Sequence, residues 1–139
     1  MGKRRKAREY ALQILFQINL GQCKFSHELL EKFWEANTSL ADVKEYADLL
    51  VKGTIENLDQ IDKIIRDSTE NWSLSRMASV DRNILRFATY ELIYRPEIPS
   101  TVIINEAIEI GKKYGTEESG PFINGILDKV AKEVREVPF

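Results

Sequence analysis

Three features of the sequence predict an all-α fold of about seven helices in two packed helical bundles. Apolar residues recur every three or four positions along nearly the whole chain, which is the period of an amphipathic helix. No long segment alternates apolar and polar residues, as a half-buried strand would. The first proline is Pro96, so no proline interrupts a helix before that point. With 139 residues, we expect a single domain, 1–139, with helical halves at about 1–72 and 73–139.

The first two helices are delimited by a glycine and a serine. The first covers about residues 4–20 and stops at Gly21, because glycine readily ends a helix. Ser26 is a candidate cap for the second, because a serine side chain accepts a hydrogen bond from a free backbone N–H at a helix start. Leu12 and Phe16 lie off the apolar stripe of the first helix, which leaves both exposure and core packing open for them. The expected buried faces are Ala7, Tyr10, Ala11, Ile14, Leu15 and Ile18, then Leu29, Leu30, Phe33 and Trp34.

Two further helices complete the first half. Ser39 is the expected cap of the third helix, which ends near Leu58. The fourth helix leads to a turn at residues 71–73. Their apolar stripes are Val43, Ala47, Leu50 and Val51, then Ile61, Ile64 and Ile65.

Prolines and glycines divide the second half into three helices. The fifth begins near Ser79 and must stop before Pro96, because a residue that precedes proline avoids the helical conformation. Residues 96–99 form a stiff connector, the sixth helix closes at Gly115, and the seventh frays after Arg135. The predicted core includes Ile14, Leu15, Leu50, Ile64, Leu85, Ala107 and Leu127.

The composition excludes several classes of protein. One cysteine cannot form an intramolecular disulfide, and one cysteine with one histidine cannot make a four-ligand zinc site. We therefore expect neither a metal nor a cofactor. No run of 18 apolar residues is present, so no membrane-spanning helix is expected. These features fit a protein of the reducing cytoplasm.

No residue pattern in the chain indicates an enzyme. Cys23 and His27 are four residues apart, but no third group that would orient a thiolate–imidazole pair is evident. The neighbouring carboxylates of Asp59 and Asp62, and of 117–118, lie where solvated helix starts are expected, and the helix dipole alone favours acids there. No phosphate-binding glycine loop follows a strand.

The charge of the chain is strongly asymmetric. Residues 1–8 carry five basic side chains and no acid, whereas the remainder has a net charge of −7, within a total of −2. Positive charge at the start of a helix opposes the helix dipole, so stability does not account for these cations. A flexible basic arm that becomes ordered on a nucleic acid does account for them, with a solubilising tail as the alternative. The cations are Lys3, Arg4, Arg5, Lys6 and Arg8.

Aromatic residues add to the nucleic-acid interpretation. Unpaired bases stack on aromatic side chains, and Phe16, Tyr114 and Phe122 are candidates for such contacts. Tyr114 and Phe122 flank the turn that begins at Gly115. For any one of the three taken alone, ordinary core packing is the preferred interpretation, and only their combination with the basic arm favours RNA binding.

Several segments resemble the NusB family of bacterial transcription antitermination factors. The first is RRKAREYALQILF at 4–16, followed by WSLSR at 72–76 and VDRNILR at 80–86. INEAIE at 104–109 and FINGILD at 122–128 continue the resemblance, which covers essentially the whole chain in order.

The resemblance implies a non-catalytic RNA-binding protein. Its family binds the boxA element of nascent RNA together with the ribosomal protein NusE, as part of an RNA polymerase antitermination complex. It implies RNA contacts for Lys3, Arg4, Arg5, Lys6, Arg8, Phe16, Tyr114, Glu118 and Phe122, and a NusE surface around Arg76 and Asp81. We expect Asn105, Glu106 and Asn124 to have structural roles near helix ends and turns. Pro121 stands where the family commonly has a basic residue, which leaves the RNA contact at that position open.

Two other functions remain as alternatives at this stage. One is a stand-alone module related to the N-terminal domain of RNA cytosine methyltransferases. The other is a helical adaptor that does not bind RNA. Self-association of the free protein through its partner surface also stays open.

Overall fold

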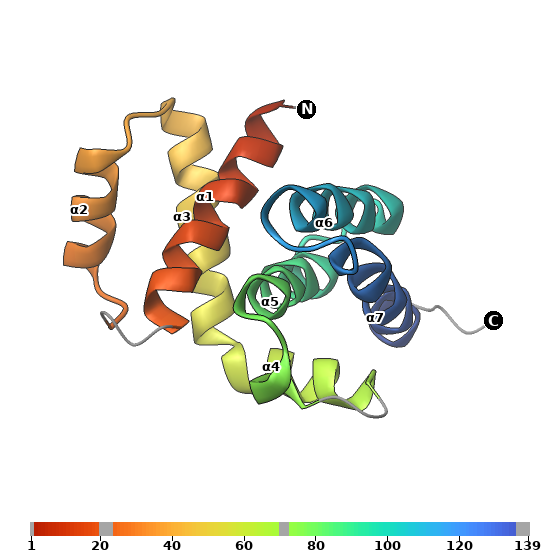
Figure 1. The fold of residues 1–139 in the computed structure, drawn as a ribbon. Coiled ribbons are helices and arrows are strands. Elements are labelled where there is room, and N and C mark those ends of the chain that lie inside the picture. Colours follow the sequence, from red (N-terminus) through yellow and green to blue (C-terminus); the bar gives the residue numbers. More distant parts are fainter. Residues whose placement is uncertain (1, 20–23, 70–72, 136–139) are drawn as a thin grey trace.

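In a computed structural model, the protein is built from α-helices and one short 3-10 helix (Figure 1). The structure describes residues 2–19, 24–69 and 73–135, and no strand occurs among them. The predicted turn at 71–73 lies partly outside these residues, and the predicted fraying after Arg135 lies wholly outside them. The elements are α1 (Gly2–Asn19), α2 (His27–Ala36), α3 (Ala41–Glu56), α4 (Leu58–Asp67), η1 (Leu74–Arg76), α5 (Ser79–Tyr94), α6 (Ser100–Tyr114) and α7 (Ser119–Arg135).

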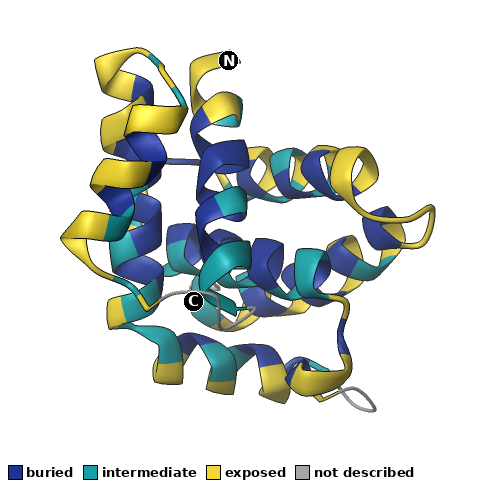
Figure 2. Ribbon diagram, turned by 60° about the vertical axis from the view of Figure 1, so that its left-hand side comes forward, coloured by how far each residue is buried: buried dark blue, intermediate teal, exposed yellow. Residues whose placement is uncertain are grey.

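Helix α5 is the centre of the fold. It packs against α1, α3, α4, α6 and α7, while α1 packs closely on α3 and α6 packs closely on α7. Figure 2 shows the buried residues gathered on the helix faces that point toward one another. The large side chains that are fully buried include Ile14, Leu50, Phe87 and Leu127, which come from four helices. The all-α prediction is therefore confirmed, and of the seven predicted core residues all but Ile64 are buried, with α5 shared between the two bundles.

Helix α2 is attached to the rest of the fold through aromatic residues. Tyr10 of α1 makes edge contacts with Phe33 and Trp34, at ring-centroid distances of 5.8 and 5.0 Å. The indole N–H of Trp34 donates a hydrogen bond to Asp48 of α3 at 2.8 Å. The predicted cap is confirmed here, because the Ser26 hydroxyl accepts a hydrogen bond from a backbone N–H of the first turn.

Some predicted details are wrong. Helix α3 is preceded by Leu40, which has no side-chain cap, so Ser39 does not cap it. For Leu12 the sequence leaves exposure open, and the side chain is 4% exposed, because its side of α1 also packs on the rest of the fold. Ile64 is partly buried, since the buried side of α4 is centred on Ile61 and Ile65.

Two features of the second half were not predicted. The 3-10 helix Leu74–Arg76 lies just before α5. Helix α7 begins at Ser119 and carries Pro121 in its first turn, where backbone N–H groups have no partner within the helix and proline is tolerated.

Candidate nucleic-acid interface

The five cations at the start of α1 do not share one face. Successive residues of a helix are turned by about 100° from one another, so a run of cations spreads around the axis. Lys3 and Arg4 point toward α3. The Lys3 ammonium lies 3.1 Å from a carboxylate oxygen of Asp42, and the Arg4 guanidinium lies over the Tyr46 ring, 4.0 Å from its centroid. Lys6 is exposed, with its ammonium 5.1 Å from the centroid of the Tyr10 ring.

Arg5 is held by a carboxylate of α6. Its Nε donates to Glu106 at 2.9 Å, and a second guanidinium nitrogen donates to the other carboxylate oxygen. The hydrogen bonds from Arg5 lower the pKa of Glu106 below its ordinary value. The expected structural role of Glu106 is thus supported, although its partners are arginines rather than backbone donors.

Arg8 lies in the interior, which contradicts its predicted place on an exposed RNA surface. It is 2% exposed, and its guanidinium makes a bidentate contact with Glu91, which is fully buried. The Tyr46 hydroxyl also donates to Glu91, and Glu106 lies 3.5 Å from Arg8. Burial and the neighbouring Glu91 charge raise the pKa of Tyr46, so it stays protonated. Arg8 therefore fastens α1 to α5, with its guanidinium turned away from solvent.

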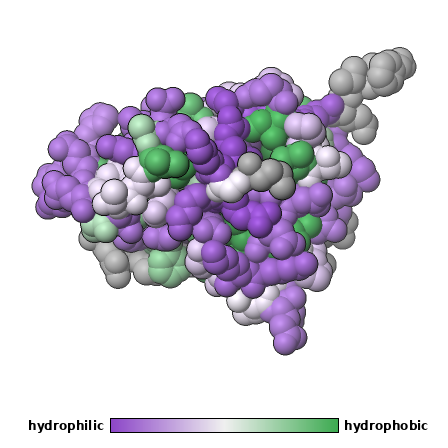
Figure 3. Space-filling view, turned by 90° about the horizontal axis from the view of Figure 1, so that it is seen from above, coloured by the Kyte–Doolittle hydropathy of each residue, from purple (hydrophilic) through white to green (hydrophobic). Residues whose placement is uncertain are grey.

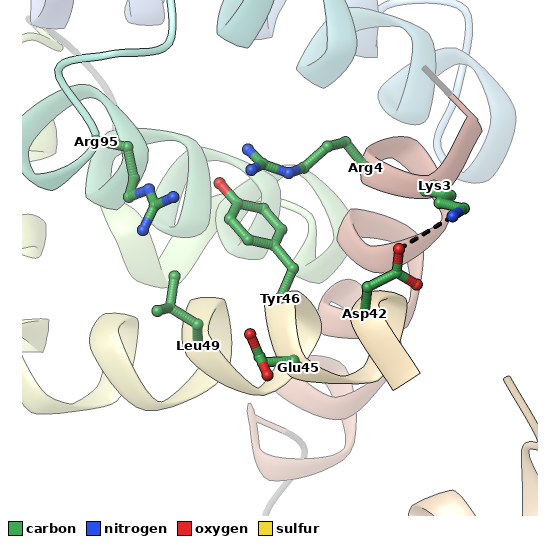
Figure 4. A pocket seen from close by; sticks show the side chains of 7 residues that line it. All are labelled: Lys3, Arg4, Asp42, Glu45, Tyr46, Leu49 and Arg95. Atoms are coloured by element: carbon green, nitrogen blue, oxygen red, sulfur yellow. Dashed lines mark ion pairs between the residues drawn. The ribbon is translucent and has the colours of Figure 1, made fainter. Parts of the chain in front are cut away.

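Lys3 and Arg4, the first two cations of α1, line a hollow between α1, α3 and the end of α5. Figure 4 shows Arg4 and Arg95 approaching Tyr46 from two elements, with Lys3 paired to Asp42 at the rim. The Arg95 guanidinium lies 5.4 Å from the Tyr46 ring centroid and pairs with Glu97 at 2.9 Å. The carboxylates of Asp42, Glu45 and Glu97 offset much of the positive charge of this hollow. Figure 3 shows a mostly hydrophilic surface with small, separate apolar patches on this side of the molecule.

The aromatic groove lies farther along α1. It is lined by Leu12, Gln13, Phe16, Gln17, Val80 and Tyr114. Phe16 is half-buried, and Tyr114 is 38% exposed, so each offers part of a ring to solvent. Beside them is a cation that sequence reasoning missed: Lys113 lies 3.1 Å from Glu9 and 5.3 Å from the Tyr114 ring centroid. The groove therefore combines an apolar floor, two aromatic rings and a nearby positive charge.

A second hollow, the acidic hollow, joins the two predicted binding regions. It brings the expected NusE residues together with two expected RNA residues, and it is lined by Arg76, Met77, Ala78, Asp81, Thr116, Glu118 and Phe122. Asp81 is 9% exposed, and its Oδ1 has no hydrogen-bond partner within the described part of the chain. Arg76 and Glu118 are exposed, and Phe122 is half-buried. A buried acceptor without a donor favours a ligand that supplies one.

The loop that borders this hollow is held by its own side chains. The Ser119 hydroxyl accepts from the backbone N–H of Thr116 at 3.0 Å, and the Thr116 hydroxyl accepts from Glu118 at 3.2 Å. Gly115 is required at the end of α6, because a Cβ there would lie 2.3 Å from the Ser119 hydroxyl. The loop thus presents Tyr114 and Glu118 from a fixed backbone.

The described residues contain neither a cluster of side chains suited to a metal ion nor a helix long and apolar enough to cross a membrane. Of the residue pairs considered for catalysis, Cys23 lies outside the described residues and His27 is exposed at the start of α2. Asp62 is paired with Arg86, and Asp59 is exposed.

Comparisons with known proteins agree with this arrangement. The family model described as the NusB family matches residues 5–132. The transcription antitermination protein NusB of Thermodesulfovibrio yellowstonii is 51% identical, over 94% of this chain and 93% of that protein. The protein of the same name from Sorangium cellulosum is 44% identical, over 99% and 97%.

Solved structures match as well. T. maritima NusB has a TM-score of 0.85 and 46% identity, over 94% of this chain and 91% of that chain. A chain from a crystal structure of antitermination factors NusB and NusE in complex with dsRNA has a TM-score of 0.85 and 30% identity, over 96% and 98%. The fold and the near full-length identity agree, and the chain belongs to the NusB family.

Proposed function

We propose that this protein is a transcription antitermination factor that binds boxA-type RNA together with NusE. The observation that carries the proposal is the near full-length similarity to proteins named transcription antitermination protein NusB. A structural relative was solved with NusE and dsRNA, which supports both partners. These relatives are not RNA methyltransferases, and so the antitermination factor is preferred over the methyltransferase module. The protein acts as a single unit, residues 1–139, in the cytoplasm, without a catalytic step.

The RNA follows the outer side of α1 in this proposal. Lys3, Arg4 and Lys6 supply exposed or partly exposed charge at the start of the helix, and Arg5 contributes where its pairing with Glu106 leaves it accessible. The aromatic groove then offers Phe16 and Tyr114 for stacking of bases. Arg8 takes no part in binding.

NusE binds at the acidic hollow. The hollow is lined by two residues expected to contact NusE, Arg76 and Asp81. It is also lined by Glu118 and Phe122, which are expected to contact RNA, so NusE bound there would lie next to the RNA. This arrangement supports joint binding of RNA and NusE, because each would bury part of the same hollow.

A salt titration tests the RNA proposal. We expect Arg4→Ala with Lys6→Ala to weaken binding of single-stranded boxA RNA, measured by fluorescence anisotropy with NusE present. The log–log slope of affinity against salt should flatten by about 1.4, at roughly 0.7 per phosphate contact on single strands. Lys129→Ala with Lys132→Ala on α7 removes the same charge from exposed positions away from the groove and serves as the matched control.

Two outcomes contradict this proposal. If the parent shows no preference for boxA RNA over a scrambled RNA with NusE present, the protein is a helical adaptor of another kind. If both double variants flatten the slope equally, the start of α1 is a solubilising tail and not a binding surface.

A further inference from the structure

We propose that an arginine hollow at the far end of α1 binds a backbone phosphate of the same RNA, which extends the RNA site beyond the aromatic groove. The hollow has a volume of about 400 Å³ and is lined by Asn19, Asp62, Arg66, Ser73, Leu74, Ser75, Arg82 and Arg86. This inference rests on the proposed function, because it concerns the path of the RNA.

The charge of the hollow is unbalanced. Three guanidinium groups line it and only one carboxylate, in a chain whose body is acidic. That carboxylate, Asp62, is fully engaged by Arg86, with Nε–Oδ1 and Nη2–Oδ2 distances of 2.9 and 3.0 Å. The remaining two arginines, Arg66 and Arg82, therefore give the hollow a net charge of +2 that no described acid offsets.

Arg82 is a guanidinium with unmet donors. Its Nη1 donates to the carbonyls of Leu74 and Met77 at 2.8 and 3.3 Å, whereas its Nε is buried and has no partner among the described residues. Burial and the nearby Arg86 lower the pKa of Arg82, as expected when a cation lacks an adjacent anion. A phosphate in the hollow would supply that anion.

Arg66 of α4 contributes a further guanidinium group to the hollow. It is exposed, and no ion pair holds it within the part of the chain that the structure describes. The hydroxyls of Ser73 and Ser75 lie 3.2 Å apart at the same hollow and offer neutral donors. Planar guanidinium groups with hydroxyls around a cavity of this size suit a phosphate group.

The arginine hollow and the aromatic groove are built from the same two helices, α1 and α5. Gln17 of α1 and Val80 of α5 line the aromatic groove, and Asn19 and Arg82, two residues farther along each helix, line the arginine hollow. From Lys6 to the end of α1 is about 20 Å at 1.5 Å per residue. Because residues two apart on a helix lie on nearly opposite sides of it, an RNA strand must pass around the C-terminal end of α1 to go from the aromatic groove to the arginine hollow.

The test compares two RNAs and one clean variant. The short single-stranded RNA carries boxA alone, and the long one adds nucleotides at both ends. Arg66→Gln removes a charge that has no partner in the described structure. Lys63→Gln, one turn away on the same helix, removes the same charge from an exposed ion pair with Asp67 and is the matched control.

We expect the parent with NusE to bind the long RNA more tightly than the short one, with a salt slope steeper by about 0.7. Arg66→Gln should weaken the long RNA about three- to tenfold and remove that extra slope, and it should leave the short RNA unchanged. Lys63→Gln should change neither RNA by more than about twofold. Arg82→Gln should act as Arg66→Gln does, provided circular dichroism shows an intact fold, because its Nη1 also holds two carbonyls.

Three results would overturn the inference. The first is that the long RNA binds no better than the short one. The second is that Arg66→Gln and Lys63→Gln have the same effect on RNA binding. The third is that Arg66→Gln weakens NusE binding in the absence of RNA and leaves the RNA length effect intact. The last result would assign the hollow to an acidic protein segment. Failure of both RNAs to bind the parent would instead contradict the proposed function itself.

Discussion

The buried ion pair between Arg8 and Glu91 gives the sharpest prediction of stability. Arg8 is 2% exposed and Glu91 is fully buried, and the Tyr46 hydroxyl donates to the same carboxylate. Arg8→Met would leave that carboxylate in the core with a single donor and no counter-charge. Breaking a buried pair by removal of one partner costs about 3–5 kcal/mol. This is a large share of the roughly 5–15 kcal/mol that stabilises a typical domain.

The triple variant Arg8→Met, Glu91→Leu and Tyr46→Phe removes the whole polar group. Apolar residues of similar volume often replace a buried ion pair at little cost, so we expect this variant to lie within about 1 kcal/mol of the parent. Urea unfolding at pH 7 measures the free energy of unfolding of the parent, the single variant and the triple variant. A loss below about 1 kcal/mol for Arg8→Met alone would refute the assignment of a buried, coupled pair.

The triple variant also separates structure from RNA binding. Arg8 and Glu91 together carry no net charge, so their joint removal leaves the charge of the protein unchanged. Because Arg8 is buried, we expect the triple variant to bind boxA RNA with NusE within about twofold of the parent. A loss of more than about tenfold in a well-folded triple variant would return Arg8 to the RNA surface.

Three further predictions concern other parts of the molecule. Gly53→Ala should lower the free energy of unfolding by about 1–3 kcal/mol in urea titrations, because a Cβ there would lie 2.2 Å from the Tyr90 ring. Because the pKa of Glu106 is lowered in the folded state, its charged form stabilises the fold at pH values above the ordinary pKa of 4.5. Glu106→Gln should therefore lower the free energy of unfolding at pH 7, and this loss should diminish as pH falls below about 4.5. An equal loss at pH 3 would exclude the charged pair with Arg5. Asp81→Asn should weaken NusE binding about tenfold in calorimetry, or ~1.4 kcal/mol, with a nearly unchanged Tm; unchanged affinity would remove Asp81 from the interface.

The helices could be predicted because their period is a local property of the sequence. The helix boundaries were harder to predict, because a residue that can cap a helix does so only where the packed helix begins directly after it. Ser26 caps α2, but Ser39 does not cap α3, since that helix begins one residue later than the serine would require. The register of α4 shows the same limit, because Ile61, Ile64 and Ile65 all fit one stripe and packing decides which lies at its edge.

The candidate site was predicted less completely, because its charges are balanced by distant residues. The sequence indicates a basic cluster, but the acids that pair with Arg5 and Arg8 are 101 and 83 positions away. One signal for Arg8 was available. It stands three residues before Ala11 and seven before Leu15, so helical spacing places it on a side of α1 that is buried. Lys113 and the arginine hollow come from separate segments and could not be linked to the basic cluster without the fold.

The division of roles along α1 explains why an acidic protein begins with a basic helix. The sequence left open a flexible arm that orders on RNA, but α1 is helical from Gly2 and is fastened at Arg5 and Arg8 by carboxylates of α6 and α5. The inward cations thus fix the helix, and the outward ones, such as Lys6, are held in place before RNA arrives. An ordered helix loses less conformational entropy on binding than a flexible arm would, so less of the interaction energy is spent on ordering the protein. The acidic body therefore orients the basic helix that we propose binds RNA.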